Sequence, residues 1–191
     1  MRTRIVLVEK GLDFDRVLID LPDQEQKQPW FLSLNPYGKV PVLVEEGAWV
    51  YESAICNEYL EDKYPMPSLA PENPSERAAM RLLIERCNSR FVPPIIRLLY
   101  THRKPKAEQD PARMARNADQ IIAEFSSLEE LLNGGDYLLG AYSLADLTFT
   151  PFLALCEQLG VSLRLHPNVE SWAARLKGRE SYEEVRVGLS G

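Results

Sequence analysis

The sequence has few residues of the kinds that build disulfide frameworks or metal sites. Its 191 residues include 3 cysteines and 2 histidines. Cys56, Cys87 and Cys156 lie far apart and form no CxxC pair, and neither histidine has a second metal-binding residue at a useful spacing. We therefore expect free thiols in a reducing compartment, which predicts a cytoplasmic protein without a metal site.

Long apolar runs and an excess of positive charge are also missing. No run is long enough to span a bilayer, and no basic segment with an apolar core and a cleavage site begins the chain. We expect neither a membrane contact nor a signal peptide. The net charge of −6 argues against a nucleic-acid partner held by a basic face. Hydrophobic residues at 45% and charged residues at 26% are typical of a globular protein.

The residue patterns divide the chain near residue 65. Strand and helix patterns alternate before that point, and helical patterns dominate after it. The stretch "PMPSLAPENPSE" holds four prolines in twelve residues and is typical of a linker. The predicted organisation is an α/β domain over residues 1–64, a linker over 65–74 and an all-helical domain over 75–191.

The first domain is predicted to alternate helices and strands. We expect a helix over 2–10 that Gly11 ends, then a strand over 14–21 and a short helix closed by Asn35-Pro36. Two strands over 40–46 and 48–52 follow, joined at Gly47. Ser53 then begins a helix, which it can cap.

The second domain is predicted to contain long amphipathic helices. Apolar residues recur at helical spacing over 75–100, where Pro93-Pro94 should bend or break the helix. A second helix is expected over 111–132. Ser143 and Asp146 form a capping-box pattern before a third, with a structural role. Two shorter helices are expected over 168–177 and 181–187.

The stretch "GKVPVLVEEGAWVYES" suggests a binding site. A proline at the first position of a strand costs no ladder hydrogen bond if that edge faces outward. We therefore predict a cis Val40–Pro41 bond, which would turn the backbone of Val40 toward open space, where it can pair with an extended, peptide-like ligand. Pro41 alternatively only protects the edge of the sheet.

Charged and polar residues flank the same stretch. Ser53 begins a helix, where free N–H groups favour an anion, and Glu52 offers a carboxylate to an ammonium group. Lys39 can hold a second carboxylate. Such a site suits a small peptide that carries an amine and carboxylates. The alternatives are that Ser53 is only a helix cap and Lys39 only a solvated lysine.

The chain resembles a known family at these residues. "NPYGKVPVL" followed by "YES" is similar to the glutathione-binding half of the cytosolic glutathione transferases, "YSLADLTFTPFL" to an element of their helical domain, and "RIVLVEKGLDF" to the end of their first helix. The resemblance covers nearly the whole chain. It implies a thioredoxin-like N-terminal domain lacking its first strand, an all-helical C-terminal domain and a homodimer.

The resemblance also implies an activity and its residues. The protein would bind glutathione as co-substrate and transfer its thiolate to a small electrophilic substrate. The backbone of Val40, ahead of Pro41, would pair with the cysteinyl part of glutathione. Glu52 and Ser53 would hold its γ-glutamyl end, and Lys39 would hold its glycyl carboxylate. The pocket for the electrophile would be lined by four residues of the long helix: Phe91, Pro94, Leu98 and Tyr100. The alternative for Phe91 and Tyr100 is that they are core residues.

The sequence departs from the family at its front. The family places a strand and a loop with the catalytic Ser, Tyr or Cys before the first helix, whereas Met1 is already in that helix, so the catalytic residue is unknown. Three explanations are open: a start further upstream, a segment left out because it was disordered, and a real truncated form. The expected strand over residues 14–21 would then lack its pairing partner. Each backbone group left buried and unpaired would cost about 1–3 kcal/mol of stability.

The alternative function is that of a non-catalytic interaction protein of the stringent starvation protein A type, which binds RNA polymerase.

Overall fold

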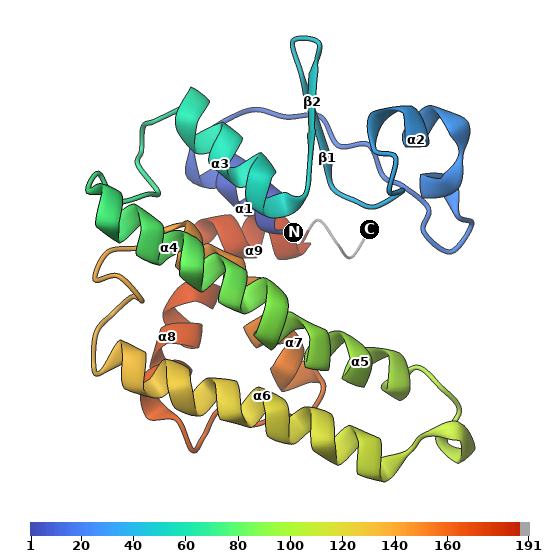
Figure 1. The fold of residues 1–191 in the computed structure, drawn as a ribbon, viewed down its shortest axis with the longest axis vertical. Coiled ribbons are helices and arrows are strands. Elements are labelled where there is room, and N and C mark those ends of the chain that lie inside the picture. The colour runs from blue at the N-terminus through green and yellow to red at the C-terminus, as the bar shows by residue number, and fades with distance from the viewer. Residues whose placement is uncertain (188–191) are drawn as a thin grey trace. The chain divides into compact units, whose positions relative to one another are not determined.

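The chain forms two compact units in a computed structural model that describes residues 1–187 (Figure 1). The first unit spans Met1–Leu69 and the second begins at Ala70. The boundary falls inside the proline-rich stretch over 65–74. Within the described part of the chain, no helix is both long and apolar enough to cross a membrane.

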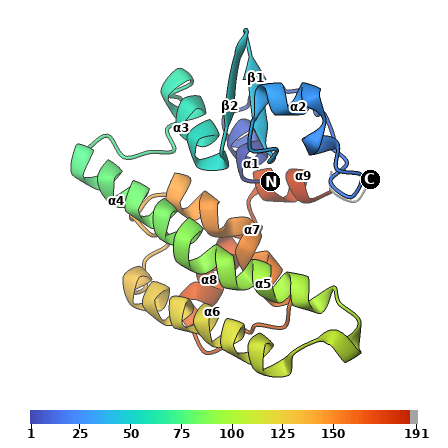
Figure 2. The ribbon, with the colours of Figure 1, turned by 45° about the vertical axis from the view of Figure 1, so that its right-hand side comes forward.

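The first unit combines helices with one hairpin. Its elements are α1 (Arg2–Glu9), the 3-10 turn η1 (Glu25–Lys27), α2 (Pro29–Leu34), β1 (Val42–Glu45), β2 (Ala48–Tyr51) and α3 (Ser53–Lys63). Both views of the fold place the hairpin between α2 and α3 (Figures 1 and 2).

The hairpin confirms the predicted pair of strands. β1 and β2 are antiparallel, with Val42 opposite Tyr51 and Glu45 opposite Ala48. Only two residues, Glu46 and Gly47, connect the strands, and both have positive φ angles of 48° and 83°. Such a turn matches the right-handed twist of paired strands, and a glycine tolerates its backbone conformation.

Helices α1 and α3 pack side by side and run parallel. Arg2 at the start of α1 contacts Ser53 at the start of α3, and Lys10 after α1 pairs with Glu61 near the end of α3. Gly11, with φ of 62°, ends α1 as predicted. The N–H of the following residue bonds back to Leu7 O at 2.9 Å, as in a Schellman motif.

The predicted strand over 14–21 is wrong. The chain over residues 12–20 has no regular secondary structure. Within residues 1–187 the named sheet contains only β1 and β2, so this segment has no ladder partner. Val17 and Leu18 are 76% and 70% exposed. Alternating residues predict a strand only where a second strand is present to accept its hydrogen bonds.

The second unit is helical throughout its regular structure. Its elements are α4 (Pro74–Arg86), the π-helical turn η2 (Cys87–Phe91), α5 (Val92–His102), the 3-10 turn η3 (Lys106–Glu108), α6 (Pro111–Leu132), α7 (Leu144–Gln158), α8 (Pro167–Lys177) and α9 (Glu180–Val187). All the helices predicted for this part of the chain are present. Pro93 and Pro94 do not break the helical run that begins at α4. The wider η2 turn precedes α5, and both prolines lie in the first turn of α5, where a missing N–H group costs least.

The core of the helical unit is built on α7. Four fully buried aromatic residues pack in series, from Phe125 through Phe91 and Phe149 to Trp172, with ring centroids 5.3 to 5.8 Å apart. The predicted capping box at the start of α7 is present. Asp146 accepts hydrogen bonds from Ser143 N at 3.0 Å and from Trp172 Nε1 at 3.0 Å. The cap therefore also fixes α8 against α7.

Candidate functional site

The loop between α2 and β1 is shaped by Asn35, which is 1% exposed. Its Nδ2 donates to Lys39 O at 2.7 Å, and its Oδ1 accepts from Tyr37 N at 3.0 Å. One amide side chain thus replaces the backbone hydrogen bonds of a turn. The sequence showed Asn35 only as a helix end; its place in an Asn-Pro-x-Gly turn is the signal that could have identified this role.

Gly38 lies at the centre of this loop and has no room for a side chain. Its φ is 59°, a conformation that L-residues rarely adopt. A Cβ at this position would lie 2.8 Å from Gln26 O and from Lys27 Nζ. The glycine therefore lets the loop pass close to η1 before it reaches Lys39 and Val40.

Val40 presents an unpaired backbone at the end of this loop. The Val40–Pro41 peptide bond is cis, as predicted. Val40 is 45% exposed, and the ladder between the strands begins only at Val42. Across residues 1–187, no backbone hydrogen bond is formed by Val40. Its N–H and C=O are thus available to an extended ligand.

Glu52 and Ser53 lie at the same end of the hairpin. Val42 pairs with Tyr51, so Pro41 and Glu52 continue the two strands beyond their last pair. Glu52 has φ of 66° and ψ of 117°, a strained conformation for a residue with a Cβ. Lys39 is exposed on the adjoining loop. The structure therefore gathers the five residues predicted to hold glutathione around one end of the hairpin.

Ser53 is not the cap of α3, which corrects the capping role predicted for it. The cap position is Glu52, without a side-chain cap bond, and Ser53 is already the first helical residue. A residue inside the helix cannot direct its hydroxyl to the N–H groups of the first turn in the way a cap residue does. Instead, Ser53 Oγ accepts a hydrogen bond of 3.5 Å from Arg2 Nη1.

Arg2 adds a cation that sequence reasoning missed, because 51 positions separate it from Ser53. Parallel packing brings the N-terminal ends of α1 and α3 together, and each end carries a partial positive charge from the helix dipole. A guanidinium group, a hydroxyl group and two helix ends therefore converge at this place. The combination favours an anionic group, and Glu52 next to it favours a cationic one.

The four residues predicted for an electrophile pocket have different environments. Phe91 is fully buried among the core aromatic rings, Pro94 is buried, and Tyr100 is 62% exposed. Leu98 is 3% exposed and lines a cavity within the helical unit that the other three do not reach. Over the described residues, no group of three His, Cys, Asp or Glu side chains is placed to hold a metal ion.

Comparison with known proteins agrees with the fold. Residues 1–63 match the family description "Glutathione S-transferase, N-terminal domain", and residues 91–180 match "Glutathione S-transferase, C-terminal domain". Among curated relatives, glutathione S-transferase F10 of Arabidopsis thaliana is 30% identical, over 99% of this chain and 92% of its own length. Maleylacetoacetate isomerase of Rattus norvegicus is 31% identical, over 95% of this chain and 84% of its own length.

A solved structure shows the same fold. The glutathione transferase of Burkholderia graminis, crystallised with two glutathione molecules bound per subunit, is 25% identical and superposes with a TM-score of 0.86. The match covers 96% of this chain and 81% of that protein. The architecture is thus a thioredoxin-like N-terminal domain followed by an all-helical C-terminal domain. The chain belongs to the glutathione S-transferase family.

Proposed function

We propose that this protein binds glutathione at the end of the β1–β2 hairpin and transfers its thiolate to a small electrophilic substrate. The observation that carries the proposal is the unpaired backbone of Val40 beside Glu52 and Ser53. An extended tripeptide can add to this backbone as a short strand while its charged ends find partners on either side.

Each part of glutathione has a partner of suitable chemistry. The cysteinyl backbone pairs with Val40 N–H and C=O, beside the turn at Pro41. The γ-glutamyl carboxylate binds Ser53 Oγ and the first N–H groups of α3, and Glu52 holds the γ-glutamyl ammonium group. Lys39, exposed on the loop that Asn35 holds, pairs with the glycyl carboxylate.

The chemistry depends on the ionised form of the glutathione thiol. The thiolate is the nucleophile, and positive charge near the sulfur favours it over the thiol. The N-terminal ends of α1 and α3 and the Arg2 guanidinium group supply such charge at this side of the first unit. The thiolate forms a carbon–sulfur bond with the electrophile, and the electron pair of the bond that breaks leaves with the departing group.

The proposal extends to the location and assembly of the protein. Cys56, Cys87 and Cys156 are all buried, and within residues 1–187 none of them forms a disulfide, which suits a reducing compartment such as the cytoplasm. We propose a homodimer as the assembly. The names of the relatives include a glutathione S-transferase and an isomerase, which supports a reaction of one of these two kinds.

Calorimetry with a matched pair of variants tests the binding step. Glutathione should bind to the wild-type chain, and Ser53→Ala should weaken binding by at least about tenfold, because a hydrogen bond to a charged group is worth about 1.5–3 kcal/mol. The control is Ser89→Ala, which should bind like the wild type, because the exposed Ser89 hydroxyl donates to Glu85 O at 2.8 Å and lies outside the proposed site. Equal affinity of wild type and Ser53→Ala would reject the assigned role of Ser53.

An activity assay tests the transfer step separately. The wild-type chain with glutathione should accelerate thioether formation from 1-chloro-2,4-dinitrobenzene, an aryl halide whose product absorbs in the near ultraviolet. Binding without acceleration for this halide, for an epoxide and for an activated alkene would reject the transferase reaction and retain only the glutathione site.

A further inference from the structure

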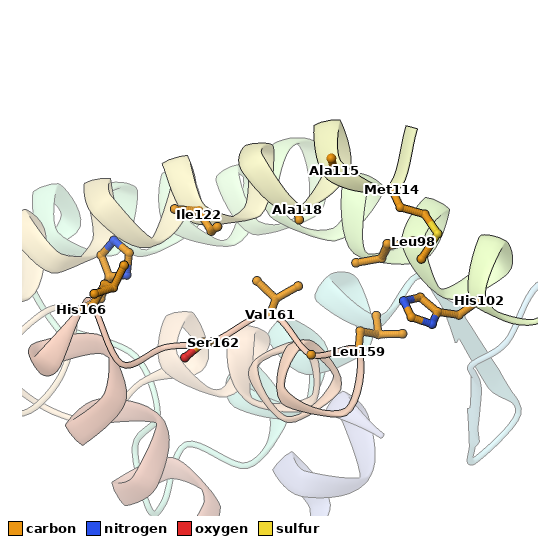
Figure 3. Close-up of a pocket in the computed structure, with 12 residues that line it drawn as sticks. Leu98, His102, Met114, Ala115, Ala118, Ile122, Leu159, Val161, Ser162 and His166 are labelled. Atoms are coloured by element: carbon orange, nitrogen blue, oxygen red, sulfur yellow. The ribbon is translucent and has the colours of Figure 1, made fainter. Parts of the chain in front are cut away.

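We propose that the helical unit contains a second ligand site, for a flat aromatic molecule that carries a hydroxyl group. The site is a cavity of about 420 Å³ between α5, α6 and the segment from Leu159 to His166 (Figure 3). This volume is within the range of about 300–1,000 Å³ found for small-molecule sites. The cavity shares no residue with the proposed glutathione site.

The lining of the cavity is mostly apolar, with polar groups at its ends. Leu98, Met114, Ala118, Ile122 and Val161 form its walls. Figure 3 shows His166 at one end of this row of side chains and His102 at the other. A mostly apolar pocket with a few polar groups is the usual form of a small-molecule site. An apolar ring system fits the walls, and the polar ends determine its orientation.

His166 supplies the polar group that selects the ligand. Its side chain is 8% exposed, and its ring packs edge-on against Phe125 with centroids 5.8 Å apart. Its Nε2 lies 3.1 Å from Ser126 Oγ, whereas its Nδ1 is buried and has no hydrogen-bond partner. A buried polar atom without a partner costs about as much as a lost hydrogen bond, so a ligand group that reaches this nitrogen supplies the partner that it lacks.

The hydrogen bonds of Ser126 determine what that partner must be. Ser126 Oγ donates its one hydrogen to Ile122 O at 3.2 Å. It therefore accepts from His166, which places the imidazole hydrogen on Nε2 and leaves a lone pair on Nδ1. The ligand must donate a hydrogen to this lone pair. A phenolic O–H does so at the end of a flat ring, whereas an ether or a ketone cannot.

The cavity wall next to His166 can adapt to a ligand. Leu165 precedes His166 and lines the same cavity, yet it is 86% exposed. A side chain with so little buried surface changes rotamer at low cost, so the proposal includes an adjustment of Leu165 when the ligand approaches the imidazole.

Two probes that differ only in the donor test this proposal. 2-Naphthol carries an O–H group, and 2-methoxynaphthalene has the same rings with only an acceptor. By calorimetry on the full chain, 2-naphthol should bind about threefold to tenfold more tightly, the value of one neutral hydrogen bond. His166→Phe keeps the ring against Phe125 and should abolish this preference. Equal affinities in the wild type, or a preference that persists in His166→Phe, would overturn the proposal.

A second variant keeps the test decisive if His166→Phe does not fold. Ala118→Phe fills the cavity from α6 and should reduce 2-naphthol binding at least about tenfold, with glutathione affinity unchanged. Ala123→Phe, an exposed position on the same helix outside the cavity, is the matched control and should bind 2-naphthol like the wild type. If Ala118→Phe binds 2-naphthol normally, the probe binds elsewhere and the site is rejected.

Discussion

Replacing Lys10 with methionine should strongly destabilise the first unit. The Lys10 side chain is fully buried, and its ammonium group lies 2.7 Å from Glu61 Oε2, whose side chain is only 6% exposed. The same Nζ donates to Tyr64 O at 2.6 Å and to Pro67 O at 3.0 Å. One cation therefore joins the end of α1 to α3 and to the segment that follows it.

The magnitude follows from what the substitution leaves behind. Methionine preserves the apolar stem but leaves the Glu61 carboxylate and two carbonyl groups buried without their cation. Breaking one side of a buried pair costs about 3–5 kcal/mol, a large part of the roughly 5–15 kcal/mol that stabilises a typical domain. Glu61→Leu in the Lys10→Met background should restore part of the loss, because no unpaired charge then remains.

Urea unfolding followed by circular dichroism measures these free energies. The control is Lys104→Met, an exposed lysine in the second unit, which should change stability by less than about 0.5 kcal/mol. A loss below about 1 kcal/mol for Lys10→Met would show that water or a shifted side chain replaces the cation. That result would refute the assignment of this pair as the anchor between α1 and α3.

Three further predictions follow from single positions. Asp146→Ala should cost at least about 3 kcal/mol in thermal unfolding, since Trp172 Nε1 and the start of α7 lose their acceptor; a loss below about 1 kcal/mol would contradict the cap. Gly38→Ala should weaken glutathione binding several-fold by calorimetry, because its Cβ collides with Gln26 O; unchanged affinity would show that the loop does not shape the site. Burial raises the pKa of the Cys56 thiol to about 11, and Cys87 and Cys156 are buried as well. The native protein should therefore not react with a disulfide reagent at pH 8, whereas the denatured protein should react at all 3 thiols. A rapid reaction of the native protein would contradict the burial of these thiols.

Features determined by local sequence could be predicted. The Glu46-Gly47 turn, the helix end at Gly11 and the capping box at Ser143 each depend on residues within a few positions of one another. In each case the conformational preference of a residue type and its neighbours decides the structure.

Features that depend on distant partners could not be predicted. The strand expected over 14–21 has the right alternation of side chains, and the resemblance showed that its partner is missing, but the alternation alone does not show that the segment then has no regular structure. The contact between Arg2 and Ser53 arises only from the parallel packing of α1 and α3. Serine is a frequent cap residue, so Ser53 was expected to cap α3, but the helix begins at Ser53 itself and Glu52 holds the cap position.

The most direct measurement is a glutathione titration followed by the backbone amide signals of the isotope-labelled chain. If glutathione adds to the hairpin edge as proposed, the largest shift changes should occur at the amides of Val40, Glu52 and Ser53, and Arg2 should respond through its contact with Ser53. The amides lining the cavity at His166 should not change. No shift changes at millimolar glutathione, or changes confined to other residues, would contradict the proposed glutathione site.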